Sequence, residues 1–429
     1  MKNIKIILFV LCVGFKTNAQ TPGTKVNPNR TPVSSLQTLL LTNNPSNGAL
    51  GNAGVASAPD ITNWTINVAK NTFQTEKNAI SISYMPNETR LIRGMAMYSV
   101  TGYSALKKEK FGTLSYNISN YNFGTAELRD DNAKYLGTQS SNELSLKLGY
   151  SKRLGNYTSG GVAIGYYRSN IFGSQSLLEN YFKPASGLNV DIGFYRNGYN
   201  KAKDGYFNYG ASIINIGGKV KYGDEQMSSY APIQFRIGSS YNYFLDSNQE
   251  DKFSFNLDMT KDLIPTPKGS VEIEKTKNKS ELGIIFSSWA DAPNGFKEEI
   301  QELRFHFGAE YLHKNMLALR AGYQHENKYK GDRKQLGFGL GLHEMGSEDI
   351  KFNLDASYSF GVFKSTGIAP TFRLSLGAYF GGKKIATSED NQLDSRENTK
   401  AKIKNSESKV SHVVSKEIKK KRRFITKRF

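Results

Sequence analysis

Apolar and polar residues alternate with a period of two in short segments from residue 79 to residue 380, and this pattern limits the possible folds more than any other feature. The stretch Phe352 to Phe360 (FNLDASYSF) shows it most clearly, and Phe253 to Met259 (FSFNLDM) repeats it. Successive side chains of a strand point to opposite faces of the sheet. The chain is therefore expected to form many strands with one apolar and one polar face.

The surroundings of such strands follow from hydropathy and composition. The chain has a mean hydropathy of -0.51 and no apolar run long enough for a spanning helix, which excludes a helical membrane protein. Two classes remain, an exported soluble β-protein and a closed barrel in a membrane. The content of 24 Tyr, 25 Phe and 40 Gly favours the barrel.

The segments predict an all-β fold, a transmembrane antiparallel β-barrel of about 14 strands occupying residues 79–380. An even number is expected for a bacterial single-chain barrel, and most segments have the length that crosses a bilayer when tilted. The predicted strands are 79–85, 94–103, 111–121, 142–153, 159–171, 187–196, 206–216, 233–244, 252–261, 302–312, 316–325, 334–344, 350–360 and 371–380.

The connections between these segments favour a membrane barrel over a soluble β-protein. They alternate between a longer series of 8 to 40 residues and a shorter series of 3 to 9 residues. Long outer loops and short periplasmic turns produce such an alternation, whereas stacked soluble sheets do not require it. The longest connection, 262–301, holds a possible hairpin at 271–274 and 282–286, which would make sixteen strands if it entered the barrel.

The first nineteen residues have the features of a cleavable signal peptide. Lys2 and Lys5 precede an apolar run at 6–13, and small residues at 17–19 suit cleavage. The run is too short for a membrane anchor, and Cys12 lacks the small neighbour expected of a lipidation site. We therefore expect export, localisation to the cell outer membrane and both termini in the periplasm.

Two segments lie outside the predicted barrel. Residues 20–78 are rich in Asn, Thr, Pro and Gly and too polar to cross lipid, which predicts an N-terminal hatch or plug in the lumen. Residues 381–429 contain 15 Lys or Arg against 6 Asp or Glu, which predicts a disordered, basic periplasmic tail. In the periplasm this tail would meet anionic lipid headgroups and acidic protein surfaces, not nucleic acid, or it would stay solvated without a specific ligand.

The sequence does not favour an enzyme. Cys12 is the only cysteine, so the exported protein would have no thiol chemistry. His306 alternates with phenylalanines and should face the lumen, while the pairs His325-Glu326 and His343-Glu344 should lie at opposite rims. No catalytic, cofactor-binding or metal site is predicted.

A motif before the first strand connects the chain to a known family. Residues 47–60 read NGALGNAGVASAPD, and residues 63–70 read NWTINVAK. In their order and spacing, these residues resemble the PorV family of the type IX secretion system, within the wider FadL-like barrel superfamily. One departure is Val68, because the family pattern has a proline between the Asn and the Ala. The basic tail after residue 380 is a second departure.

The resemblance implies a fourteen-stranded barrel that takes part in protein secretion. Its partners would be the type IX translocon barrel, the surface-attachment complex and the C-terminal β-domains of secreted cargo, with outer-membrane lipid around it. The alternative is a FadL-like channel for hydrophobic solutes such as fatty acids. If residues 20–78 form a hatch, its structural residues would be Gly48, Gly51, Gly54, Asp60, Trp64 and Asn67.

Overall fold

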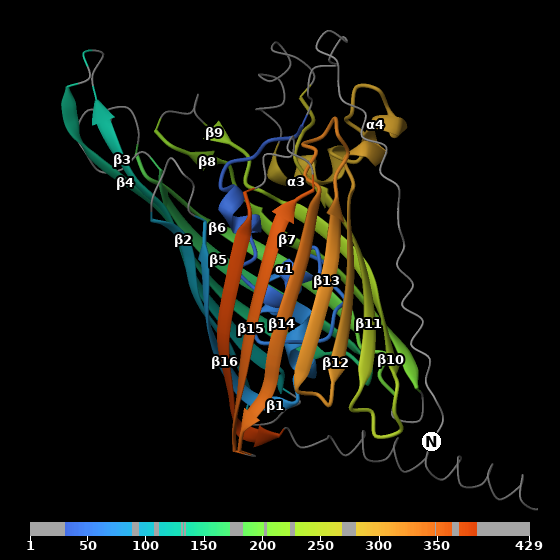
Figure 1. Ribbon diagram of the computed structural model, residues 1–429. Coiled ribbons are helices and arrows are strands. Elements are labelled where there is room, and N and C mark those ends of the chain that lie inside the picture. The colour runs from blue at the N-terminus through green and yellow to red at the C-terminus, as the bar shows by residue number, and fades with distance from the viewer. Residues whose placement is uncertain are drawn as a thin grey trace, which may run out of the picture.

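The computed structural model of the chain shows a closed antiparallel barrel of fourteen strands (Figure 1). The structure describes residues 31–87, 94–106, 111–129, 132, 134–171, 183–200, 204–223, 228–267, 280–347, 349–362 and 369–383. The barrel strands are β1 (Glu76–Pro86), β2 (Met95–Ala105), β3 (Thr113–Arg129), β4 (Tyr135–Arg153), β5 (Thr158–Asn170), β6 (Ala185–Arg196), β7 (Gly205–Gly217), β10 (Gln234–Phe244), β11 (Lys252–Asp262), β12 (Arg304–His313), β13 (Leu317–His325), β14 (Gln335–Gly346), β15 (Ile350–Gly361) and β16 (Thr371–Lys383).

Each barrel strand pairs with its neighbours in sequence order, and the sheet closes where β1 meets β16. At this closure Ile82 lies opposite Leu376. The remaining two strands, β8 (Val220–Lys221) and β9 (Ser228–Ser229), form a separate small sheet, so β7 pairs directly with β10. The prediction of fourteen barrel strands is confirmed, and the sixteen-stranded alternative is wrong.

The two faces of the barrel have opposite polarity. On β1, Ile80 and Ile82 are exposed, whereas the intervening Ser81 and the following Ser83 are buried. The same alternation of exposed apolar and buried polar side chains continues around the barrel. An apolar outer face is the face that a lipid bilayer solvates, and the polar face lines the interior.

The two ends of the barrel differ in the length of their connections. We call the end that carries the longer connections the loop end; it bears β8, β9 and the helices α3 (Glu281–Ser287) and α4 (Phe296–Gln301), at the top of Figure 1. The opposite end, the turn end, has the short connections and holds the beginning of β1 and the end of β16.

Two predictions about the loop end were wrong. Residues 122–141 were expected to be a connection, but the ladder between β3 and β4 continues to the pair Arg129 and Tyr135 and forms a ribbon above the barrel (Figure 1). The bulge after Asn122, which includes Gly124 at φ 81°, interrupts the period of two from which the strands were predicted. Residues 282–286 were a possible strand but lie in α3, and residues 271–274 lie outside the described residues.

Residues 31–75, which we call the lumen segment, lie inside the barrel, where α1 is visible behind β14 in Figure 1. The segment contains η1 (Gln37–Leu40), α1 (Pro45–Ala49), η2 (Asn63–Thr65) and η3 (Val68–Phe73). No helix in the described part of the chain is long and apolar enough to cross a membrane. The predicted signal peptide and nearly all of the predicted tail lie outside the described residues.

Candidate functional site: the lumen segment and the loop-end platform

The lumen segment touches opposite sides of the barrel wall. Helix α1 contacts β13, β14, β15 and β16, and η3 contacts β3, β4, β5 and β6. Two asparagines shape these helices locally: Asn44 accepts a hydrogen bond from Ser46 N ahead of Pro45, and Asn67 accepts one from Ala69 N. Side-chain caps of this kind stabilise helices that are too short to be stable alone.

Of the predicted hatch glycines, Gly48 and Gly51 lie where the segment approaches the wall, and Gly54 lies where the segment folds against itself. A Cβ on Gly48 would come within 2.8 Å of Arg373, and one on Gly54 within 2.8 Å of Asn47. Gly51 has φ +64°, and a Cβ there would lie 2.5 Å from the backbone nitrogen of Tyr323. The contact is just as close from the wall side, because a Cβ on Gly322 of β13 would lie 2.1 Å from the backbone of Leu50 in the segment. A side chain at position 51 would therefore separate two backbones that now touch.

Polar side chains of the wall bind the backbone of the lumen segment. Asp258 on β11 accepts hydrogen bonds from Gly54 N at 2.6 Å and Val55 N at 2.8 Å. Three further wall side chains donate to carbonyl oxygens of the segment: His306 to Gly51 at 2.9 Å, Arg236 to Asn52 at 3.3 Å and Arg373 to Thr42 at 2.8 Å. These bonds satisfy backbone groups that would otherwise be buried without partners.

Asp60, Trp64 and Asn67 organise the later part of the segment. Asp60 accepts from Thr62 N at 2.7 Å and from Asn63 N at 2.8 Å, which closes a turn before η2. Trp64 is buried in one cluster with Val68 and Ala163 of β5. Asn67 donates to the carbonyl oxygens of Val55 and Phe194, each at 2.9 Å. Asn67 thus positions this turn through its side chain, although the proline of the family pattern is absent.

A fully buried lysine, Lys70, lies in η3 near the end of the segment. Lys70 Nζ donates to Gly54 O at 2.7 Å and to Ser57 Oγ at 2.9 Å. Burial lowers the pKa of Lys70 to about 7, although the negative charges of Asp60 and Asp258 act in the opposite direction. Lys70 was not predicted as a site residue, because nothing in the sequence distinguishes it from an exposed lysine.

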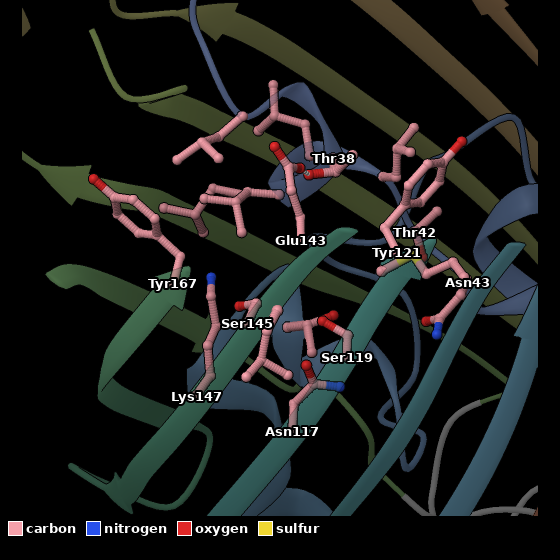
Figure 2. A pocket seen from close by; sticks show the side chains of 18 of the residues that line it. Thr38, Thr42, Asn43, Asn117, Ser119, Tyr121, Glu143, Ser145, Lys147 and Tyr167 are labelled. Atoms are coloured by element: carbon pink, nitrogen blue, oxygen red, sulfur yellow. Dashed lines mark hydrogen bonds between the residues drawn. The ribbon is translucent and has the colours of Figure 1, made fainter. Parts of the chain in front are cut away.

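A small cavity separates η1 from the wall at β2 to β5, and Figure 2 shows the side chains that line it. Its volume is about 60 Å³. Its polar lining includes Glu143, which accepts from Thr38 and Ser169, and Lys147, whose Nζ is 2.7 Å from Asp191. The cavity has room for a few water molecules, and it is far below the 300 Å³ or more typical of small-molecule pockets.

The histidines lie apart from one another. His306 is buried in the lumen as predicted, bonded to Gly51 O and Thr260. His343 pairs with Asp355 at 2.9 Å near the turn end, while His325 bonds to the Tyr323 hydroxyl at the loop end. The adjacent glutamates pair elsewhere, Glu326 with Arg333 and Glu344 with Lys351. Among the described residues, His325 and His343 therefore do not share a site.

At the loop end, α3 and α4 form a surface that we call the platform (residues 281–301). Its inner side is apolar, because Ile284 and Ile285 pack against Ile233 and Leu263. Its outer side exposes Phe286 (78 % exposed) and Phe296 (79 % exposed), together with parts of Trp289 and Ile300. Exposed aromatic side chains above the strands are unusual for a surface that faces only water.

Buried ion pairs fix the platform to the barrel. Lys261 of β11 pairs with Glu299 at 2.9 Å and Glu302 at 2.6 Å. Lys330, in the connection between β13 and β14, pairs with Glu298 at 2.7 Å and Glu302 at 2.8 Å. Ion pairs that are buried and shared in this way hold a defined geometry, since breaking one leaves an uncompensated buried charge. The aromatic surface therefore rests on a rigid base.

Comparisons with solved structures return membrane channels at low identity. The TodX deltaS2S3 mutant monoaromatic hydrocarbon channel is 11% identical, with 78% of this chain and 96% of that chain covered and a TM-score of 0.46. The CymD monoaromatic hydrocarbon channel is 10% identical, with 79% and 97% covered and a TM-score of 0.45. A Pseudomonas aeruginosa FadL homologue is 10% identical, with 79% and 98% covered and a TM-score of 0.41.

The comparison with curated proteins found no match. The family described as "Type IX secretion system protein PorV" matches residues 24–269, which is more than half of the chain. This range includes the whole lumen segment and the strands from β1 to β11. The protein is an outer-membrane β-barrel, and it belongs to the PorV family of the type IX secretion system.

Proposed function

We propose that this barrel acts in type IX secretion by binding secreted cargo, the translocon barrel and the surface-attachment complex at its loop end. In this proposal the loop end faces outward, both termini lie in the periplasm, and residues 1–19 are a cleaved signal peptide. Residues 20–78 act as a hatch, residues 79–380 as the barrel and residues 381–429 as a basic periplasmic tail.

The platform is the observation that carries this proposal. Phe286 and Phe296 expose large apolar surfaces outside the lipid-facing strands, and buried ion pairs hold the helices beneath them. Aromatic anchors on a rigid base are the residues that dominate protein-protein interfaces. If partners bind to the loops between strands, the structure of the barrel does not have to change on binding.

The lumen supports a closed barrel better than an open channel. The lumen segment is held by wall side chains and by close backbone contacts on opposite sides. A cavity beside η1 and a second beside α1 have volumes of about 60 Å³ and 180 Å³ and linings that mix polar with apolar side chains, whereas an acyl chain needs a longer apolar pocket. We therefore retain the FadL-like solute channel as the alternative that the experiments must separate from secretion.

A secretion assay in the native host tests the proposal. The gene is deleted and replaced by the wild type or by the double variant Phe286→Ser/Phe296→Ser, and secreted proteins with a C-terminal β-domain are quantified in the medium. Each aromatic side chain is expected to contribute about 2 kcal/mol to the free energy of binding. Losing both should weaken partner binding by far more than tenfold and should stop secretion. Leu154→Ser, in the exposed turn after β4 at the opposite end, is the matched control. Normal secretion by the double variant would contradict the proposal.

A further inference from the structure

Buried carboxylates outnumber the buried ammonium groups beneath the platform. The carboxylates are those of Asp291, Glu298, Glu299 and Glu302, and the ammonium groups are those of Lys261 and Lys330. Asp291 comes from the connection between α3 and α4, and the glutamates come from α4 and the residue that caps it. If all of these groups were ionised, negative charge would be in excess in a place that water does not reach. Such an excess costs free energy, so one acid of the group is expected to carry a proton.

Asp291 is the acid of this group without a cationic partner. Each of the three glutamates accepts a hydrogen bond from at least one of the two lysines. Asp291 is only 7 % exposed and forms no ion pair with any described residue. Its Oδ2 accepts one long bond from Thr266 N at 3.3 Å, and its Oδ1 is buried without a hydrogen-bond partner in the described part of the chain.

The surroundings of Asp291 favour its protonated form. One oxygen of Asp291 lies within 4.8 Å of an oxygen of Glu299 and of an oxygen of Glu302. Burial raises the pKa of Asp291, and the negative charges of Glu302 and Glu299 raise it further, against the hydrogen bonds from Thr266. The protonated acid has no charge to repel the glutamates, and it has an O–H donor in a place rich in acceptors.

The arginines of the neighbouring elements supply no spare cation. Arg304 of β12 pairs with Asp262 at 2.6 Å and with Glu326 at 3.6 Å, and Arg333, in the connection between β13 and β14, pairs with Glu326 at 2.5 Å. These charges balance one another. Among the described residues no cation is therefore left for Asp291, and a proton is what removes its charge.

We propose that Asp291 is a pH-sensitive latch of the platform. While Asp291 carries a proton, the connection between α3 and α4 stays packed against α4 and against the chain after β11. When Asp291 loses the proton, repulsion from Glu299 and Glu302 loosens this packing. The latch rests on the proposed function in one respect: partners bound at Phe286 and Phe296 would be held more firmly in acid than in alkali.

The direction of this pH dependence follows from the two states of the platform. In a released platform Asp291 is in water and has its ordinary pKa, whereas in the packed platform its pKa is higher. The packed state therefore binds more protons than the released state. Packing is firmest at low pH and weakens as the pH rises through the higher pKa.

Hydrogen exchange of the full-length protein in detergent tests the latch without any partner. The amides of residues 281–301 are followed by mass spectrometry at about pH 5 and about pH 8, with the intrinsic pH dependence of exchange corrected. In the wild type their protection should fall about threefold or more from the lower to the higher pH, while the protection of the barrel strands stays constant. Protection of residues 281–301 that stays equal or rises with pH would overturn the proposal.

Two variants with opposite expected effects show which carboxylate is responsible. Asp291→Asn is uncharged at every pH and resembles the protonated acid. At about pH 8 its platform should exchange about threefold or more slowly than that of the wild type, and the pH dependence should disappear. Glu298→Gln removes a carboxylate that is paired with Lys330, so its platform should exchange faster and keep the pH dependence.

A gel that separates the folded barrel from the unfolded chain shows that each variant has folded. If Asp291→Asn exchanges as fast as the wild type at about pH 8, or faster, Asp291 is not the latch. Because no partner is present, this result would not affect the secretion proposal, and normal secretion by the double variant of Phe286 and Phe296 would not affect the latch.

Discussion

The carboxylate of Asp258 accepts a hydrogen bond from the backbone nitrogen of Gly54 at 2.6 Å, although 204 residues separate the two in the chain. The same oxygen accepts a second bond, from Val55 N at 2.8 Å. Both bonds involve a charged acceptor in a buried place, which makes them stronger than bonds between neutral groups. This contact therefore contributes strongly to holding the glycine-rich turn against the wall.

Replacing Asp258 should loosen the lumen segment without opening the barrel. Asp258→Asn removes the charge that accepts both backbone bonds, and bonds to charged groups contribute about 1.5–3 kcal/mol each. Hydrogen exchange at residues 48–60, followed by mass spectrometry, should become at least about tenfold faster, while exchange in the strands stays unchanged. Asp246→Asn, in the turn between β10 and β11, is the control. Unaltered exchange in Asp258→Asn would show that the contact does not hold the segment.

A side chain at position 51 should destabilise the protein more than one at another left-handed glycine. Gly51→Ala adds the strain of φ +64°, about 1–2 kcal/mol, to a Cβ placed 2.5 Å from Tyr323 N. Gly94, at φ +77°, has open space around its Cβ position, so Gly94→Ala adds the strain alone. The samples are heated in detergent and run on a gel that separates the folded barrel from the unfolded chain. The temperature at which the band of the folded barrel disappears should fall clearly further for Gly51→Ala than for Gly94→Ala. Equal temperatures for the two variants would argue against close packing in the lumen.

Docking of the lumen segment should depend on pH through Lys70. Its pKa is about 7 in the folded protein and about 10.5 when the lysine is free in water. Between these values the released segment binds more protons than the docked one, so docking becomes more stable as pH rises from 7 and is weakest below 7. The unfolding temperature of the wild type should therefore rise relative to that of Lys70→Met as the pH is raised from about 6.5 to about 9.5, roughly the window set by the two pKa values.

An exposed lysine provides the control for this experiment. Lys152→Met removes the same charge from an exposed position of β4, so its difference from the wild type should not change over that range. A pH response of Lys152→Met equal to that of Lys70→Met would mean that general charge effects, and not the buried amine, control docking.

Strand number and most strand ends could be predicted because lipid imposes a simple rule on each strand. The outward residues must be apolar and the inward ones face a polar interior, so the period of two is visible in the sequence. Residues above the lipid-facing part of the barrel do not have to follow this rule. The ribbon at 122–141 rises above the barrel and has no lipid-facing side, and the short apolar run at 282–286 has no length or period that distinguishes a helix from a strand.

The three glycines of the lumen segment and Asp60, Trp64 and Asn67 could be selected from the sequence because they stand in a recognisable motif. Their partners could not. Asp258, Arg236 and Arg373 are three of many polar residues on the inward face, and only the register of the closed barrel shows which of them reach the segment. The platform was missed for a related reason, since its ion pairs join β11, α4 and the connection after β13.

Affinity purification from native outer membranes tests the central claim most directly. A tagged wild-type chain and the double variant Phe286→Ser/Phe296→Ser are extracted in mild detergent, and the bound proteins are identified by mass spectrometry. The wild type should retain a large translocon barrel and secreted proteins that share a C-terminal β-domain, and the double variant should lose them while Leu154→Ser keeps them. Recovery of the wild-type barrel without these proteins, with fatty acid or another hydrophobic solute bound instead, would contradict the secretion account and favour a solute channel.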